Sequence, residues 1–540
     1  MQKIRQIVCH SFAIQLHGWL RILWASCFAL VSMALSVAQA QTTNYTLGTA
    51  ALLVGPAAGT NSVVLAVKPT SGGWTATANT NWLHLDTADQ SGTGSTNVIF
   101  TYDANSGPTR SGTFTIGNQT LTVTQAGSTY AAARQITTLV VSDAPNDPGG
   151  LAVDGTGNVF FAESFSNTIR EWRLASNTTI TLVSSGLDEP GGMAMDAAGN
   201  VYFVDSLHGA VKEWSPVSNN VTTVLALAPN SDPTDVAVYG NQLYVAVASG
   251  SEVLDWTIGS RRPPLTVANG DVPVGVKLDA AGNIYVVNFF GNNVQKTAVD
   301  GGTVTLVSEG LKNPEGVAVD GAGNVYVADA AIGVIDEWSA VNGNVTTLVS
   351  NLFPDYVAVD GAGNIYFGNG GTNELLELPY AFVDPTPKLE GLSAGSDSLP
   401  SVLPTTENLL PPFAPTSDQS WLTITGITND VVSFSFTSNT GPARTANITL
   451  LGQTIPITQG TIGTPSILTG AQTLGNGVLQ FGFTNTESAS LTVLSTTNVA
   501  LPLSNWTVVG TALNIGPGQY QFISQPTTND SQRFYTVRSP

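Results

Sequence analysis

The side chains best suited to chemistry in this sequence are acids and amides that recur about every forty residues. Each ends a short apolar segment, as in NVFFAE and NIYVVN. Five of the six copies carry an acid or amide at this position: Glu163, Asp205, Asn288, Asp329 and Asn369. Two further acids, Glu315 and Asp355, directly follow the proline that begins their copies. Such groups suit Ca²⁺ or Mg²⁺, which bind several oxygen ligands.

These seven residues are therefore a candidate ligand-binding rim, for a divalent cation or another polar ligand. The alternative is that they hydrogen-bond the neighbouring loops and bind nothing, and the sequence leaves the metal unknown. No catalytic residues are predicted. Cys9 and Cys27 lie in the N-terminal segment, which excludes disulfides and thiol chemistry beyond it. Only His84 and His208 follow residue 40, too few for a histidine-rich zinc site.

A sixfold repeat supplies the elements that must position these groups. The motif PGGLAVDGTGNVFF recurs with variations, and its six copies begin at Pro148, Pro190, Pro233, Pro273, Pro314 and Pro354. Two more short strand-like segments follow in each copy, which gives four strands per repeat. Four strands every forty residues or so are typical of one propeller blade. The aspartate ending the first strand of five copies is interpreted as a structural turn residue.

The sixth repeat ends without a fourth strand, because a proline-rich stretch follows Asp384. The missing strand is predicted at residues 136–142, ahead of the first repeat, where the sequence reads ITTLVVS. Its pairing with the sixth sheet would close the ring and remove two exposed edges. We therefore predict an all-β fold with a six-bladed propeller over residues 135–380.

This pattern resembles the NHL repeat family. The resemblance implies a propeller fold, and such propellers include recognition domains, structural spacers, virginiamycin B lyase and gluconolactonase-like hydrolases. Fold alone does not choose among them. A lyase of that kind needs catalytic histidines that this sequence lacks. A gluconolactonase-like site needs only Glu, Asn and Asp on a divalent metal, so that reading stays open.

Two flanking modules repeat each other. Residues 43–127 contain NSGPTR and TLTVTQAG, and residues 386–460 contain NTGPAR and TIPITQG. The arginine and the glutamine of these motifs are 15 residues apart in both modules. They resemble the BACON family of immunoglobulin-like sandwiches, which implies an attachment to secreted enzymes and a role in binding glycans or mucin. Residues 465–540 alternate apolar and polar residues, which predicts a C-terminal β-module.

The first forty residues read as an export signal, with a basic start, an apolar run and Ala38-Gln39-Ala40 before the expected cleavage. A retained membrane anchor is the alternative. Without this segment the chain has 15 basic and 38 acidic residues, a net charge of −23. That charge repels nucleic acid and anionic lipid. We expect a secreted, extracellular or periplasmic monomer with no nucleic-acid partner and no membrane insertion once the signal is removed.

The predicted function is a secreted binding or scaffold protein that recognises a protein or a carbohydrate through the propeller mouth or the sandwich modules. Three or more β-modules, an export signal and the lack of a catalytic set favour this reading. Two alternatives remain open: a divalent-metal-dependent gluconolactonase-like hydrolase, and a purely structural extracellular protein. No cofactor is required, although Ca²⁺ or Mg²⁺ fits the rim.

Overall fold

The computed structural model describes residues 42–538, except for 134, 142–147, 229, 461–468, 475–477, 485–490, 500, 502–504, 517–518 and 526–531. The export signal predicted over 1–40 lies outside these residues. The described elements are strands, apart from the single-turn 3₁₀ helix η1 (Thr87–Asp89). This confirms the predicted all-β class. None of the described helical segments is long and apolar enough to cross a membrane.

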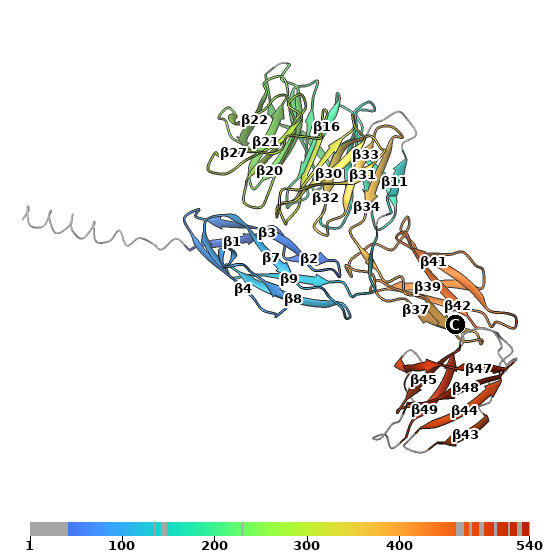
Figure 1. The fold of residues 1–540 in the computed structure, drawn as a ribbon. Helices are drawn as coiled ribbons and strands as arrows, with labels where there is room; N and C mark the ends of the chain where they lie inside the picture. Colours follow the sequence, from blue (N-terminus) through green and yellow to red (C-terminus); the bar gives the residue numbers. More distant parts are fainter. Residues whose placement is uncertain are drawn as a thin grey trace, which may run out of the picture.

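Six four-stranded sheets form the propeller in the upper part of Figure 1. Each of the first five blades uses four consecutive strands. They are β12 (Pro148–Val153), β13 (Val159–Glu163), β14 (Thr168–Arg173) and β15 (Thr178–Val183); β16 (Pro190–Met195), β17 (Val201–Asp205), β18 (Ala210–Ser215) and β19 (Asn220–Ala226); β20 (Pro233–Tyr239), β21 (Gln242–Val247), β22 (Glu252–Thr257) and β23 (Leu265–Asn269); β24 (Pro273–Leu278), β25 (Ile284–Asn288), β26 (Asn293–Thr297) and β27 (Thr303–Val307); and β28 (Gly316–Val319), β29 (Val325–Asp329), β30 (Val334–Trp338) and β31 (Val345–Ser350).

The sixth sheet joins both ends of the ring. It contains β32 (Pro354–Val359), β33 (Ile365–Asn369), β34 (Glu374–Leu378) and, at its outer edge, β11 (Thr137–Val141). β11 pairs antiparallel with β34, from Thr137 opposite Glu377 to Val141 opposite Glu374. The first strands of neighbouring blades are in contact all the way round, including β12 with β32. The strand that precedes the first repeat in the sequence therefore completes the last blade.

A repeated aspartate fixes the turn between the first and second strands of a blade. In the fifth blade, Asp320 Oδ1 accepts hydrogen bonds from the backbone N–H groups of Ala322 and Asn324, at 2.9 and 2.8 Å. Its Oδ2 accepts from Asn324 Nδ2 at 2.9 Å and Tyr326 Oη at 3.1 Å. The turns of the second, fourth and sixth blades repeat this set, and the first blade repeats it without the tyrosine. The turn aspartates are therefore structural.

The two duplicated modules are both two-sheet sandwiches. The first contains β1 (Asn44–Leu47), β3 (Gly59–Lys68), β7 (Thr96–Tyr102) and β5 (Leu83–His84) in one sheet, and β2 (Ala51–Val54), β9 (Gln119–Gln125), β8 (Arg110–Ile116), β4 (Gly73–Ala78) and β6 (Ser91–Thr93) in the other. The second contains β36 (Lys388–Glu390), β42 (Gln453–Gln459), β41 (Arg444–Leu450) and β38 (Thr416–Ser417), facing β37 (Gly395–Ser398), β40 (Val431–Phe436) and β39 (Leu422–Thr428).

The arginine and glutamine of the duplicated motif lie opposite each other on adjacent strands. Arg110 Nε donates to Gln125 Oε1 at 2.9 Å, and Arg444 Nε donates to Gln459 Oε1 at the same distance. Each guanidinium also lies over a tryptophan of its own module, at 4.4 Å from the ring centre in the first and 4.3 Å in the second. The shared 15-residue spacing therefore reflects one structural device used twice.

The C-terminal module also has two sheets. One contains β43 (Thr469–Thr473), β44 (Leu479–Thr484), β48 (Gln519–Ile523) and β47 (Leu513–Gly516), and the other contains β46 (Thr507–Thr511), β45 (Thr492–Thr496) and β49 (Phe534–Arg538). Its core is aromatic. Phe481 contacts Phe522 and Tyr535, with ring centres 5.6 and 5.7 Å apart.

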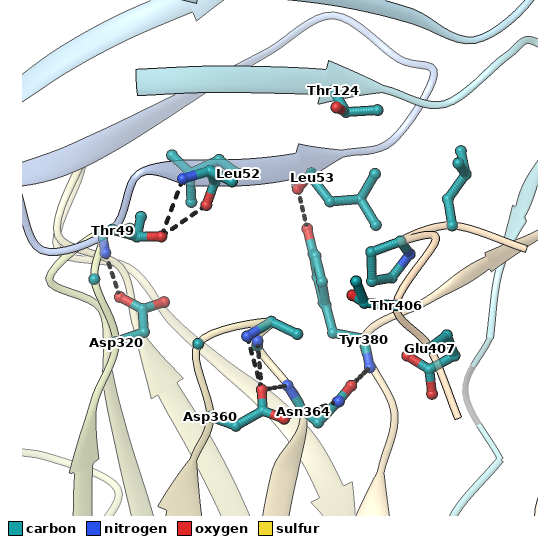
Figure 2. A pocket seen from close by; sticks show the side chains of 18 of the residues that line it. Thr49, Leu52, Leu53, Thr124, Asp320, Asp360, Asn364, Tyr380, Thr406 and Glu407 are labelled. Carbon is teal, nitrogen blue, oxygen red and sulfur yellow. Dashed lines mark hydrogen bonds between the residues drawn. The ribbon is translucent and has the colours of Figure 1, made fainter. Parts of the chain in front are cut away.

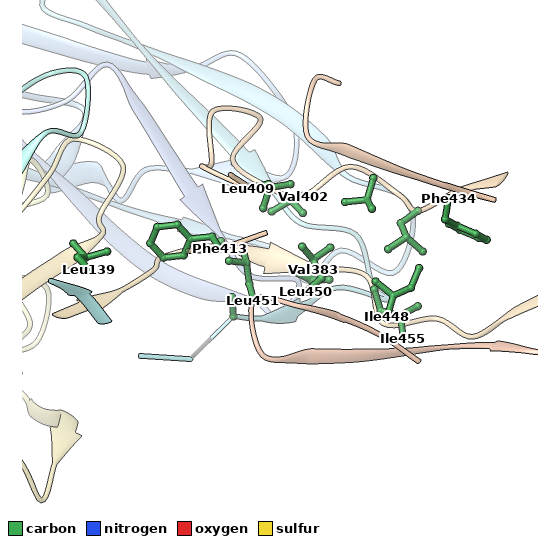
Figure 3. Packing of buried hydrophobic residues seen from close by; sticks show 14 of the residues in the cluster. Leu139, Val383, Val402, Leu409, Phe413, Phe434, Ile448, Leu450, Leu451 and Ile455 are labelled. Carbon is green, nitrogen blue, oxygen red and sulfur yellow. The ribbon is translucent and has the colours of Figure 1, made fainter. Parts of the chain in front are cut away.

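A two-stranded neck holds the ring to the second sandwich. β10 (Ala131–Ala132), which leads into the ring, pairs with β35 (Phe382–Val383), which leads out of it. One continuous apolar cluster runs from Leu139 of the sixth blade through Val383 to Phe434 and Ile455 in the sandwich core (Figure 3). The neck therefore ties the ring closure to the hydrophobic core of the neighbouring module.

Candidate functional site

The predicted rim residues lie at one side of the ring, which we call the loop face. It carries the loops between second and third strands and the loops that enter the first strands. Glu163 lies opposite Pro148 and Thr168, and Asn369 lies opposite Pro354 and Glu374. The five side chains that end second strands are only 0–4% exposed, which places them inside their own blades: Glu163, Asp205, Asn288, Asp329 and Asn369.

In three blades this side chain holds the loop that enters the first strand. Asp205 Oδ1 accepts a hydrogen bond from the Asp188 backbone N–H at 2.7 Å. Asn369 Oδ1 accepts from the Phe353 N–H at 3.0 Å, and Asp329 Oδ2 accepts from the Lys312 N–H. Burial raises the pKa of Asp329, while these backbone hydrogen bonds lower it. The contacts fit the loop-bonding alternative stated above.

Basic side chains pair with two of the rim acids, Glu163 and Asp205. Arg170 Nη1 donates to Glu163 Oε1 at 2.7 Å, and Thr168 Oγ1 donates to the other oxygen at 2.9 Å. His208 Nδ1 lies 2.9 Å from Asp205 Oδ2, which also pairs with Lys212. Both acids are therefore engaged within their blades.

The remaining predicted residues are Asn288, Glu315 and Asp355. Asn288 Nδ2 donates to Asn293 Oδ1 at 2.8 Å, within the fourth blade. Glu315 and Asp355 are partly exposed near the start of first strands. Among the described residues, no group of three or more His, Cys, Asp or Glu side chains has a geometry that could hold a metal ion. Glu163, Asp205 and Asn288 therefore have partners within their own blades, and a ligand-binding role for the seven rim residues stays a prediction.

Large apolar side chains stand exposed on the same loop face. Five blades contribute one each, with exposed fractions between 42% and 74%: Phe165, Leu207, Phe290, Ile332 and Phe353. The first four lie between second and third strands, and Phe353 precedes the first strand of the sixth blade. Backbone hydrogen bonds between the two kinds of loop hold this face together, as from Gly370 N to Phe353 O at 3.0 Å. Sequence analysis of polar residues alone missed this ring of apolar groups.

The opposite side of the ring, the turn face, carries the aspartate turns and meets the first sandwich. Val64 N donates to Gly321 O at 3.1 Å, and the buried Ser62 Oγ donates to Ala322 O at 2.7 Å. Val64 also packs with Ala66 and Ala281. One face of the propeller is therefore covered by another module, while the apolar groups of the loop face remain exposed.

A cavity of about 1060 Å³ lies between the turn face, the first sandwich and a loop at 401–408 of the second sandwich. Figure 2 shows Leu53 above it, Asp360 below it, and Tyr380 and Glu407 at its side. Tyr380 Oη donates to Leu53 O at 3.0 Å across the module boundary. Three segments that are far apart in the sequence thus enclose one space.

The cavity is lined by acids without basic partners. Its described lining includes six acidic residues and no Lys, Arg or His: Asp154, Asp320, Glu337, Asp360, Glu377 and Glu407. Burial raises the pKa of Glu407 to about 8, with Asp360 and Asp430 adding to it. Burial, then Glu407 and Asp360, raise the pKa of Glu377 well above its usual range. Sequence analysis missed this cavity; the available signals were the repeated turn aspartate and the repeated acid in the third strand, such as Glu337 and Glu377.

Comparison with known proteins supports the module assignment in part. The BACON family model, described as "Putative binding domain, N-terminal", matches residues 72–126 and 414–460. These matches fall within the two predicted BACON-like modules. No curated protein matches this sequence.

Solved structures resemble the chain at low identity. Virginiamycin B lyase from Staphylococcus aureus, solved as an inactive variant with quinupristin, is 13% identical with a TM-score of 0.38, and the match covers 45% of this chain and 98% of the lyase. A gluconolactonase from Xanthomonas campestris is 15% identical with a TM-score of 0.40, over 46% and 91%. A protein of unknown function from Bacteroides thetaiotaomicron is 14% identical with a TM-score of 0.41, over 63% and 98%.

Proposed function

We propose that this chain is a secreted binding protein that recognises a protein partner through the loop face of an NHL-type, six-bladed propeller. The observation that carries the proposal is the set of exposed apolar side chains on that face. Exposed apolar groups gathered on one face mark interaction sites more often than chance exposure does. Phenylalanine, leucine and isoleucine favour a protein partner, because sugar surfaces need many polar contacts as well.

The organisation of the modules supports the same proposal. The first sandwich covers the turn face, so recognition by the ring is left to the loop face. The rim acids and amides fasten the loops that carry the apolar groups, as Asn369 does for Phe353. They thereby keep a binding surface rigid, which lowers the entropy lost on association. We assign the sandwiches the role of spacers that hold this face away from the attachment point.

The gluconolactonase-like alternative has less support. Its site requires Glu, Asn and Asp around one cation, whereas Glu163 is bonded to Arg170 and Asn288 to Asn293. The carbohydrate alternative assigns binding to the sandwiches. It is tested by the same experiment, because sandwich binding does not depend on the loop face.

The test is affinity capture from the extracellular fraction of the source cells. The triple variant Phe165→Ser, Phe290→Ser and Phe353→Ser is compared with a control that changes Val217, Val304 and Val345 to Ser. These valines are exposed, at 46–93%, and lie away from the loop face. A protein retained by wild type and control but lost from the loop-face variant supports the proposal. Equal retention by all three proteins, or retention of glycan alone, contradicts it.

A further inference from the structure

The third strands of the blades differ in charge at one repeated position. This position lies opposite an aromatic residue of the second strand, as Lys296 does opposite Tyr285 and Glu377 opposite Tyr366. A tryptophan follows it in four blades, but Thr297 follows Lys296 and Leu378 follows Glu377. The position carries an acid in five blades and lysine in the fourth. The fourth blade therefore shows what a cation does at this place in the repeat.

In the fourth blade, the ammonium of Lys296 balances the turn aspartate. Its Nζ lies 3.8 Å from Asp279 Oδ2 and 5.1 Å from the centre of the Tyr285 ring. Tyr285 Oη donates to the same carboxylate oxygen at 3.0 Å. The ammonium is stabilised both by the face of the tyrosine ring and by the charge of the carboxylate.

The sixth blade has the same aspartate and tyrosine but lacks the ammonium. Tyr366 Oη donates to Asp360 Oδ2 at 3.2 Å, and Glu377 stands where the lysine would be. Glu377 is 2% exposed and Glu407 is 6% exposed. The Oε2 atom of each has no hydrogen-bond partner among the described residues, and both residues line the cavity. Buried polar atoms without a partner commonly mark the place of a bound group.

We propose that the cavity between the three modules binds a small organic cation. Its ammonium group lies beside Asp360 and over the ring of Tyr366, between the carboxylates of Glu377 and Glu407, at the place that Lys296 Nζ occupies in the fourth blade. The cavity volume of about 1060 Å³ is ample for an alkylamine or a diamine. The lack of basic residues in the described lining selects for positive charge, and the tyrosine faces favour an organic ammonium over a hydrated metal ion.

The probes are butylammonium and 1,4-diaminobutane, with butanol as the neutral match to butylammonium and Ca²⁺ as the inorganic cation. Titration calorimetry and thermal unfolding of the full chain measure binding. Both amines are expected to bind and raise Tm, whereas butanol and Ca²⁺ leave Tm unchanged. Equal effects of butanol and butylammonium overturn the proposal, as does stabilisation by Ca²⁺ that depends on Glu377.

Three variants locate the site. Glu377→Gln is expected to weaken amine binding at least about tenfold, a loss of roughly 1.4 kcal/mol. Glu377→Lys supplies the chain's own ammonium, as Lys296 does, so binding is expected to vanish while Tm rises. Glu213→Gln is the control, because Glu213 occupies the same repeat position in the second blade, outside the cavity lining. Unchanged amine affinity in both Glu377 variants contradicts the proposal. If the affinity-capture test of the loop face fails, the amine-binding result still stands, because the two tests probe different faces of the propeller.

Discussion

At the scale of single residues, the repeat works as an internal comparison. The turn aspartates, which look alike in sequence, make the same bonds in blade after blade. The third-strand position varies and sets the local charge, from Lys296 in the fourth blade to Glu377 in the sixth. In the first blade the acid at this position, Glu171, pairs with Arg173 at 3.1 Å. Conserved local geometry and variable charge therefore coexist in one scaffold.

The buried Glu407 predicts a fall in stability as pH rises. Its pKa is raised from 4.5 to about 8 in the folded chain, so the folded state holds the proton more tightly than the unfolded state. This contribution is full below pH 4.5 and is lost as pH rises towards about 8, at about 1.4 kcal/mol per pKa unit. Glu407→Gln keeps a neutral side chain at every pH, so its Tm is expected to decline less over that range.

Thermal unfolding followed by circular dichroism across this range is the measurement, in a buffer free of amines. Asp300→Asn is the matched control, since Asp300 is exposed in a turn of the fourth blade and far from the cavity. Parallel Tm curves for wild type and Glu407→Gln would show that the carboxyl carries no raised pKa.

At the scale of elements, the sequence patterns predicted the strands, which repeat at a fixed spacing, and missed the contacts between modules, which depend on the fit of two surfaces. Repeat spacing placed the strands of each blade, and the unpaired sixth repeat located β11, because each strand must find a partner within a local register. Packing between modules has no such period. The contact of Gly321 with Gly48, and the cavity between Tyr380 and Glu407, depend on surfaces that come together only after each module has folded. The rim residues were visible in sequence, and bonding to the neighbouring loops was one of the two roles predicted for them. The partner of each side chain was not predictable, because it depends on where the loop backbone lies after folding.

The close contact between the first sandwich and the turn face predicts that one added methyl group at this contact will weaken the docking of the sandwich. A Cβ at Gly321 would lie 2.7 Å from backbone atoms of Gly48, whereas a Cβ at Gly361, the equivalent turn residue of the sixth blade, would meet nothing within 4 Å. Gly321→Ala should therefore push the sandwich off the turn face, at a cost of about 1–3 kcal/mol. Gly361→Ala should change little.

Hydrogen exchange at Val64 reports this contact, because its N–H donates to Gly321 O at 3.1 Å. Faster exchange at Val64 is expected in Gly321→Ala and wild-type exchange in Gly361→Ala. Equal exchange rates in wild type and both variants would mean that the sandwich is not docked through these turns.

At the scale of the whole molecule, the modules divide the propeller into a covered side and an open side. The first sandwich and the 401–408 loop enclose the acidic cavity on the turn face. The neck of β10 and β35 fixes the second sandwich to the closed ring, through the cluster that contains Val383 and Phe434. The loop face stays uncovered, and we propose it as the recognition surface. A rigid platform of this kind presents its loops without reordering them on binding.

Hydroxyl-radical footprinting of the protein, free and bound to its captured partner, tests the recognition claim most directly. Oxidation of the exposed loop-face side chains Phe165, Leu207, Phe290, Ile332 and Phe353 is expected to fall in the complex, while Val217 on the turn face and Leu389 in the second sandwich stay as reactive as in the free protein. Protection of Leu389 or Val217, with the five loop-face residues unchanged, would contradict recognition through the loop face.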